Sequence, residues 1–265
     1  MTRRVGTGTL RLSKVVAQQI AAELSFACRQ IDRRDWWHIL LKSAGRASSD
    51  TVTSKCRQVR NLGRLARSTG QRYIRDGVRN SARGDAGRAK QFVVGLPSRI
   101  RTYADEFRRL KEQQQADQVV DMMLTWIIFW ASAGGSDLEG GLPDTDLAFG
   151  IGNHRNVVSH TVLLGLGSEI ALRLGIEVFG EIHSRLPSHH MRAWDSSYTF
   201  LQTHRRASIN AMWAGIGAHF LKDANLFAEA TKPYTGMPIS MPMDVHQALF
   251  AANGAACEAA AFVRD

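Results

Sequence analysis

The chain has 265 residues, of which 44% are hydrophobic and 22% are charged, and this ordinary balance excludes a wholly disordered protein. Its three cysteines are too few and too widely spaced for a disulfide scaffold or a Cys-x-x-Cys zinc knuckle, and they are typical of a reducing compartment. Residues 1–115 contain 25 lysines and arginines against 9 acidic residues, whereas the rest of the chain contains 9 against 15. The resulting charges of +16 and −6 predict two regions with different roles, residues 1–116 and residues 117–265.

The sequence shows no segment suited to crossing a membrane. Its longest uncharged apolar stretch, residues 122–136, would span about 22 Å as a helix, which is less than the ~30 Å hydrocarbon core of a bilayer. The first ten residues lack the continuous apolar run of a secretory signal. We expect a cytoplasmic protein, and a peripheral position at the inner face of the membrane remains open.

Helical periodicity dominates the first half of the chain. Apolar residues recur with a helical period in residues 13–31, whereas the small and polar residues 44–54 predict a loop. Arginines alternate with apolar residues from 55 to 90, which predicts one or two basic amphipathic helices, interrupted near Gly70 and with a hinge at residues 81–87.

The second half is predicted to be helical as well, with two long loops. Six glycines in residues 134–152 are typical of an irregular functional loop, and three prolines predict a loop at residues 232–243. Further predicted helices are residues 97–115, 119–133, 157–183, 208–230 and 245–263. Because alternating runs suited to strands are scarce, we expect an all-α protein, with a helical bundle-like domain preceded by a basic helical region.

The basic region suggests an anionic partner. Seven arginines are the candidate contacts: Arg57, Arg60, Arg64, Arg67, Arg72, Arg75 and Arg79. They could contact nucleic-acid phosphates without sequence specificity, or a phospholipid membrane whose interface also accepts the apolar residues between them. A solvated face, or a face docked on the acidic half of the chain, is the alternative for any single arginine. The sequence also leaves a homo-oligomer open.

Three short groups of carboxylates and imidazoles in the acidic half are candidate metal ligands. They contribute Asp144, Asp146, His154, His160, His219 and Asp223. His219 and Asp223 are four residues apart in a predicted helix, so both side chains can reach one ion. Each group alone has a simpler interpretation, such as a hydrogen-bonded core histidine or an Asx turn. Shared coordination of a cation would remove the cost of burying all of them.

This donor set favours a divalent metal, Zn²⁺ or Mn²⁺ in preference to Mg²⁺. Asp144 and Asp146 could both bind one ion or bridge two, and either could orient a water molecule as general base. Arg155 lies beside a candidate ligand and could hold an anionic oxygen of the substrate. The catalytic candidates are therefore Asp144, Asp146 and Arg155, which would act with metal-bound hydroxide on a phosphoester.

The order of these motifs resembles a known family. The segments LPDTD, HRNVVSH and GIGAHFLKD, followed by the loop TKPYTGMPISMP, resemble the LexA-regulated, inner-membrane-associated family of metal-dependent hydrolases over residues 135–243. The resemblance implies a helical hydrolase in which the six residues named above bind metal. The sequence departs from the family pattern at Leu147, where the family has histidine, and at Asn156 and Val158, where it has glycine and threonine.

We therefore expect a metal-dependent hydrolase acting on a phosphoester, either a phospholipid or a nucleic acid. The alternative is a non-catalytic protein that binds nucleic acid or a membrane surface and has a structural or decayed metal site. Four other histidines are weaker candidates for the site: His183, His189, His190 and His204. The adjacent pair His189 and His190 cannot easily direct both rings at one ion and is expected to be a solvated loop pair.

Overall fold

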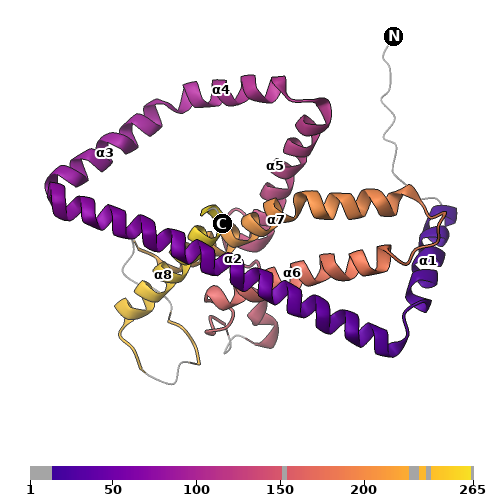
Figure 1. Ribbon diagram of the computed structural model, residues 1–265. Coiled ribbons are helices and arrows are strands. Elements are labelled where there is room, and N and C mark those ends of the chain that lie inside the picture. The colour runs from indigo at the N-terminus through magenta and orange to yellow at the C-terminus, as the bar shows by residue number, and fades with distance from the viewer. Residues whose placement is uncertain (1–13, 151–153, 227–232, 237–239, 264–265) are drawn as a thin grey trace, which may run out of the picture. The chain divides into compact units, whose positions relative to one another are not determined.

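The computed structural model describes residues 14–150, 154–226, 233–236 and 240–263. These residues form α1 (Lys14–Arg29), α2 (Arg33–Asp76), α3 (Val78–Val94), α4 (Leu96–Arg109), α5 (Glu112–Ala133), the 3-10 helix η1 (Pro143–Phe149), α6 (Val162–His183), α7 (Arg192–Ala224) and α8 (Met243–Phe262) (Figure 1). No strand occurs among them, so the predicted all-α fold is confirmed. None of the described helices is long and apolar enough to cross a bilayer.

The chain forms two compact units, each assembled from stretches that are distant in sequence. Unit 1 comprises Met1–Ala47 and Arg173–Thr203, and unit 2 comprises Ser48–Leu172 and His204–Asp265. The division predicted at residue 116 is based on charge and stays a prediction.

Unit 1 is held together by a buried carboxylate on α1. Glu23 accepts hydrogen bonds from the backbone nitrogen of Met191 (3.2 Å) and from the indole nitrogen of Trp194 (2.8 Å). Trp194 also packs on Phe179, with 5.9 Å between the ring centres. These contacts connect α1 to the segment between α6 and α7.

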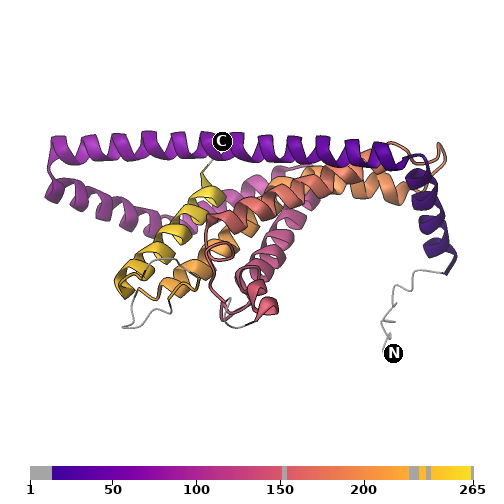
Figure 2. The same cartoon turned by 90° about the horizontal axis from the view of Figure 1, so that it is seen from below.

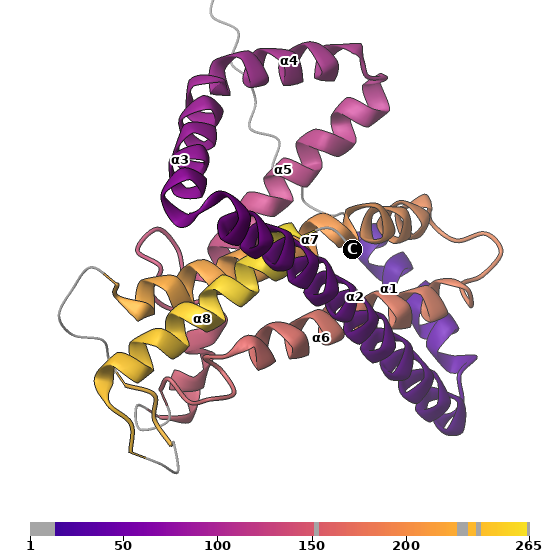
Figure 3. The same ribbon diagram turned by 60° about the vertical axis from the view of Figure 1, so that its left-hand side comes forward.

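The core of unit 2 is centred on the second half of α7. From Ile209 to Phe220 almost every α7 side chain is buried, as expected for a helix that is surrounded by neighbours on all sides. Cys257 and Ala260 of α8 belong to the same apolar cluster, and Phe129 of α5 packs against it. Figures 2 and 3 show α8 lying along this part of α7.

A polar contact inside this core joins α2, α6 and α7. The Glu169 side chain is fully buried, accepts a hydrogen bond from the Trp213 indole nitrogen (2.6 Å) and pairs with the Lys55 ammonium (3.0 Å). Lys55 also lies over the Trp213 ring, 4.6 Å from its centre. On the next turn of α2, Gln58 donates to the backbone oxygens of Ala260 and Val263 in the C-terminal part of the chain. The part of α2 from Ser48 onward, which carries the arginines at 57 to 67, therefore belongs to the same unit as the predicted metal ligands.

The loop predicted at residues 44–54 and the break near Gly70 are both wrong, because α2 is continuous through them. Ser43, Ala47, Thr51 and Gln58 are buried at helical spacing and give α2 a packing face. From Ser43 to Gln58 this face consists of small and polar side chains, so a search for large apolar residues does not detect it there.

Other boundaries also differ from the prediction. The break after α2 is at Gly77, whose φ of 77° ends the helix, and residues 81–87 are helical within α3 instead of forming a hinge. The helix predicted at 208–230 begins earlier, at Arg192, and its last residues lie outside the described part of the chain.

The packing of α6 on α7 yields a matched pair of substitutions. A Cβ atom at Gly165 would overlap the Trp213 ring, whereas a Cβ atom at Gly167 meets nothing within 4 Å. We expect Gly165→Ala to lower the free energy of unfolding by about 1–3 kcal/mol, because the indole must shift. Gly167→Ala should raise it by about 0.5–1 kcal/mol, since alanine favours the helix. Urea unfolding measures both, and equal effects of the two substitutions would contradict this packing.

Candidate metal centre

The Gly-rich loop after α5 turns the chain back onto the end of that helix. Gly134 ends α5 in the left-handed conformation (φ 95°), and Gly141 also has a positive φ (75°). A Cβ atom at either position would overlap backbone of the opposite side of the loop. The backbone nitrogen of Leu142 donates to the Ser132 oxygen (3.2 Å) and closes the turn. Because of this close approach, η1 begins beside the buried end of α5.

η1 places two carboxylates with different environments. The backbone nitrogen of Gly140 donates to Asp144 Oδ2 (2.6 Å), so Oδ1 of Asp144 faces the centre of the cluster. Asp146 Oδ2 accepts hydrogen bonds from Ser159 Oγ (2.5 Å), the Arg155 backbone nitrogen (3.0 Å) and Asn156 Nδ2 (3.3 Å). Asp146 therefore holds the His154–His160 segment in place.

That segment depends on residues that sequence reasoning did not identify as functional. Asn156 Oδ1 accepts from the Ser159 backbone nitrogen (3.0 Å) and shapes the turn that precedes His160. Two residues beyond α7 hold the same turn, since Tyr234 Oη donates to the His160 oxygen (2.7 Å) and Thr235 Oγ1 donates to the His154 oxygen (2.7 Å).

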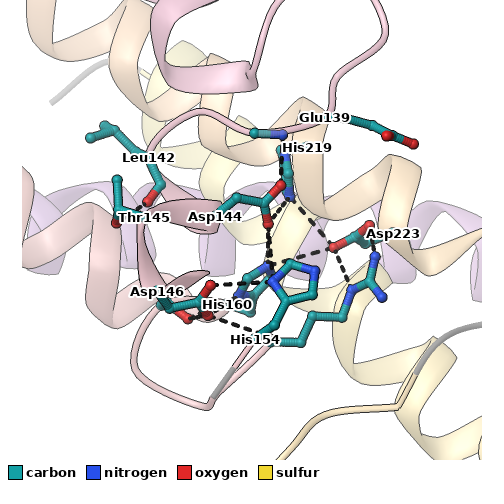
Figure 4. A network of polar contacts seen from close by, with 12 residues as sticks. Glu139, Leu142, Asp144, Thr145, Asp146, His154, His160, His219 and Asp223 are labelled. Carbon is teal, nitrogen blue, oxygen red and sulfur yellow. Dashed lines mark hydrogen bonds and ion pairs between the residues drawn. The ribbon is translucent and has the colours of Figure 1, made fainter. Parts of the chain in front are cut away.

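The six predicted ligands converge, as Figure 4 shows. Asp144 Oδ1 lies 3.3 Å from His160 Nε2 and 3.6 Å from His219 Nε2, and these three atoms lie within 4.8 Å of one another. Ligand atoms around a tetrahedral zinc, each about 2.0–2.1 Å from the metal, are roughly 3.4 Å apart. The spacing between the carboxylate and the two imidazoles therefore fits a single ion.

The two imidazoles have their other ring nitrogen fixed by hydrogen bonds. His219 Nδ1 faces the Ala133 backbone oxygen (3.1 Å), and His160 Nδ1 faces Ser159 Oγ (2.9 Å). With Nδ1 donating in each ring, the lone pair of Nε2 points to the centre, which is the usual arrangement of metal-bound histidine. Asp144 Oδ1, His160 Nε2 and His219 Nε2 are buried and make no hydrogen bond within the described part of the chain. Three metal-ligating atoms that face one another and lack hydrogen-bond partners fit a bound cation.

The charge of the cluster also favours a cation. Asp144, Asp146 and Asp223 face Arg155 and the histidines, which leaves a net charge of −2 when the imidazoles are neutral. Burial alone would lower the pKa of His219, but the adjacent Asp144 and Asp223 raise it to about 9. Burial opposes ionisation of Asp144 too, yet the adjacent imidazoles lower its pKa below the usual range. Without a metal ion, a proton on His219 supplies part of the missing positive charge.

Asp223 has a second partner in this cluster. Its Oδ2 lies 3.6 Å from His160 Nε2 and 3.5 Å from His219 Nε2, so His219 and Asp223 face the same side of α7. Arg155 binds both Asp223 oxygens, through Nε (3.2 Å) and Nη2 (2.9 Å), and has a positive φ of 63°. Burial opposes ionisation of Asp223, but His219 and Arg155 lower its pKa to about 2. The structure thus makes Arg155 a partner of a candidate ligand, and its role toward substrate stays a prediction.

A second group of ligand atoms comprises Asp146, His154 and His160. His154 Nδ1 lies 3.2 Å from Asp146 Oδ1 and 3.5 Å from Asp144 Oδ1. His154 is the most exposed of the six side chains, at 21%, so the cluster is open to solvent on this side. The two groups share His160 and therefore adjoin each other.

The arginines of the basic region are placed mainly on the surface. Arg57, Arg60, Arg64 and Arg67 are exposed at intervals of three and four residues, which puts them on one face of α2. Arg75 and Arg79 are exposed too. Arg72 differs, because it is half-buried and forms two 2.9 Å hydrogen bonds to Asp85 of α3.

The other histidines lie outside this cluster. His204 pairs with Asp121 (2.7 Å), and His183 and His190 both contact Asp195. His189 is exposed.

Comparisons of the chain with models of protein families, with curated proteins and with solved structures gave no match. The resemblance in the motifs therefore stays a prediction, and the function must be argued from the site.

Proposed function

We propose that this protein is a metal-dependent hydrolase of phosphoesters, with its metal held by the buried cluster on η1, the His154–His160 segment and α7. The observation that supports this most is the set of three buried, unsatisfied donor atoms facing one point: Asp144 Oδ1, His160 Nε2 and His219 Nε2. Buried polar side-chain atoms in folded proteins almost always have a hydrogen-bond partner or a bound ion. Three buried ligand atoms that face one another without a hydrogen bond therefore support a bound cation.

Two imidazoles and a carboxylate favour Zn²⁺ or Mn²⁺ over Mg²⁺, which prefers oxygen ligands and retains its water. Asp144, His160 and His219 would hold the ion, and Asp223 lies next to them as a further ligand. A divalent cation in this place would lower the pKa of a water molecule and polarise a phosphoryl oxygen.

The protein's own groups supply the rest of the chemistry. Asp146 orients the His154–His160 segment through three hydrogen bonds on one oxygen, and its other oxygen faces His154. His154 lies on the side of the cluster that is open to solvent, next to the carboxylates of Asp144 and Asp146, and is placed to transfer a proton between them and water. Arg155 supplies a guanidinium suited to an anionic substrate oxygen, in exchange for one of its contacts with Asp223. A phosphate oxygen bound to Arg155 would thus take the place of one Asp223 oxygen, and the guanidinium would keep a negatively charged partner.

A membrane surface fits the basic region better than a nucleic acid does. In addition to the exposed arginines of α2, the junction of α3 and α4 exposes large apolar side chains, including Val93 (62%), Val94 (70%) and Ile100 (65%). Phosphate contacts to nucleic acid give no reason for this exposure, whereas aliphatic side chains between arginines can enter a lipid interface. We therefore propose an anionic phospholipid surface as partner and a phospholipid headgroup ester as substrate class.

Metal content separates this proposal from its alternatives. We expect the purified protein to bind Zn²⁺ or Mn²⁺, and His219→Ala to bind at least one ion fewer per chain than wild type, because a buried ligand is removed. His204→Ala is the matched control, since His204 is buried on the same helix but contacts Asp121. Elemental analysis after dialysis measures the metal. Equal content in all three proteins would contradict the metal site, and metal without metal-dependent hydrolysis of phosphoesters would favour a structural or decayed site.

Vesicle binding tests the partner. The full chain should bind phosphatidylserine vesicles in a co-sedimentation assay, more weakly at high salt, and the double variant Val94→Ser and Ile100→Ser should bind roughly tenfold more weakly. Phe262→Ser is the control, because Phe262 is also exposed but lies at the end of α8. Salt-sensitive binding to DNA combined with unchanged vesicle binding of the double variant would contradict the membrane and favour nucleic acid.

A further inference from the structure

A second group of metal-ligating side chains lies in unit 1, outside the cluster described above. It comprises His183 at the end of α6, His190 in the segment between α6 and α7, and Asp195 in the first turn of α7. The Nε2 atoms of His183 and His190 lie 2.9 and 3.1 Å from the same oxygen, Asp195 Oδ1. These three ligand atoms lie within 4.8 Å of one another.

Both rings are held so that Nε2 faces the centre of the group. His190 Nδ1 lies 2.8 Å from the Pro187 backbone oxygen, which can only accept, so Nδ1 is the donor. The His183 ring stacks on Tyr198, with 4.8 Å between ring centres and 9° between planes. A neutral His190 then presents the lone pair of Nε2 to a carboxylate oxygen. This contact is favourable when a cation, either a proton or a metal ion, lies between the two atoms.

The surrounding chain keeps the group in this arrangement. Glu23 of α1 is buried and accepts hydrogen bonds from the Met191 backbone nitrogen and the Trp194 indole nitrogen, which are the two ends of the segment between His190 and Asp195. Both histidines are about one-fifth exposed and Asp195 is 58% exposed, so an ion can enter from solvent. The ligands are therefore prepared by packing and hydrogen bonds, and their outer side stays open.

We propose that His183, His190 and Asp195 form a second binding site for a divalent cation of the Zn²⁺ class. Two imidazoles and one carboxylate bind the ion, and water completes its coordination. An ion here connects the end of α6 to the start of α7 across residues 184–194. The site is separate from the proposed hydrolase centre and does not depend on it.

The test compares neighbouring histidines in the full-length protein. Chelator-treated wild type, His190→Ala, Asp195→Asn and His189→Ala are dialysed against ZnCl₂, and bound zinc per chain is measured. His189 precedes His190 but is exposed and lies outside the group, so it is the matched control. We expect His190→Ala and Asp195→Asn each to bind one zinc fewer than wild type, and His189→Ala to bind the same number.

The comparison remains decisive if one variant is unstable or if the hydrolase centre is empty. Circular dichroism identifies loss of helix, and Asp195→Asn alters an exposed side chain, so it decides the outcome if His190→Ala unfolds. The difference between Asp195→Asn and His189→Ala does not depend on how many ions bind elsewhere. Equal zinc content in Asp195→Asn, His189→Ala and wild type would overturn the second site.

Discussion

The structure of unit 2 around η1 depends on the electrostatic balance of its buried acidic cluster. Three carboxylates lie close together where water is largely excluded, and a single guanidinium, that of Arg155, partly offsets their negative charge. Burial of unpaired charge is costly, so the fold needs further positive charge at this point. The imidazoles can supply it as protons, as the raised pKa of His219 indicates, or they can act as neutral ligands to a metal ion.

The elements that meet here are distant in sequence and are held by polar contacts around the ligands. Asp146 positions the segment that contains His160, Ser159 connects Asp146 to the His160 ring, and the Ala133 oxygen at the end of α5 fixes the His219 ring. The ligand positions therefore depend on the Gly-rich turn and on the end of α5 as much as on the ligands themselves. Tyr234, beyond α7, completes the support through the His160 oxygen.

The convergence of the candidate site could be predicted from sequence because its residue types conflict with their surroundings. Aspartate and histidine within otherwise apolar segments need partners if they are buried, and the spacing of His219 and Asp223 fixes a common face. Asn156 and Ser159 could not be assigned this way, since their importance comes from the backbone turn and from Asp146, which lies elsewhere in the sequence. The course of α2 was mispredicted for a related reason, because from Ser43 to Gln58 its buried side chains are small or polar, and the partner of Gln58 on α8 lies far away in the sequence.

The proposed hydrolase centre requires a metal ion at the buried cluster, and anomalous X-ray diffraction at the zinc edge from crystals grown with Zn²⁺ tests this most directly. We predict an anomalous peak about 2.0–2.2 Å from each of Asp144 Oδ1, His160 Nε2 and His219 Nε2. Absence of anomalous density among these atoms, with ordered water bound to them instead, would show that the cluster does not hold zinc.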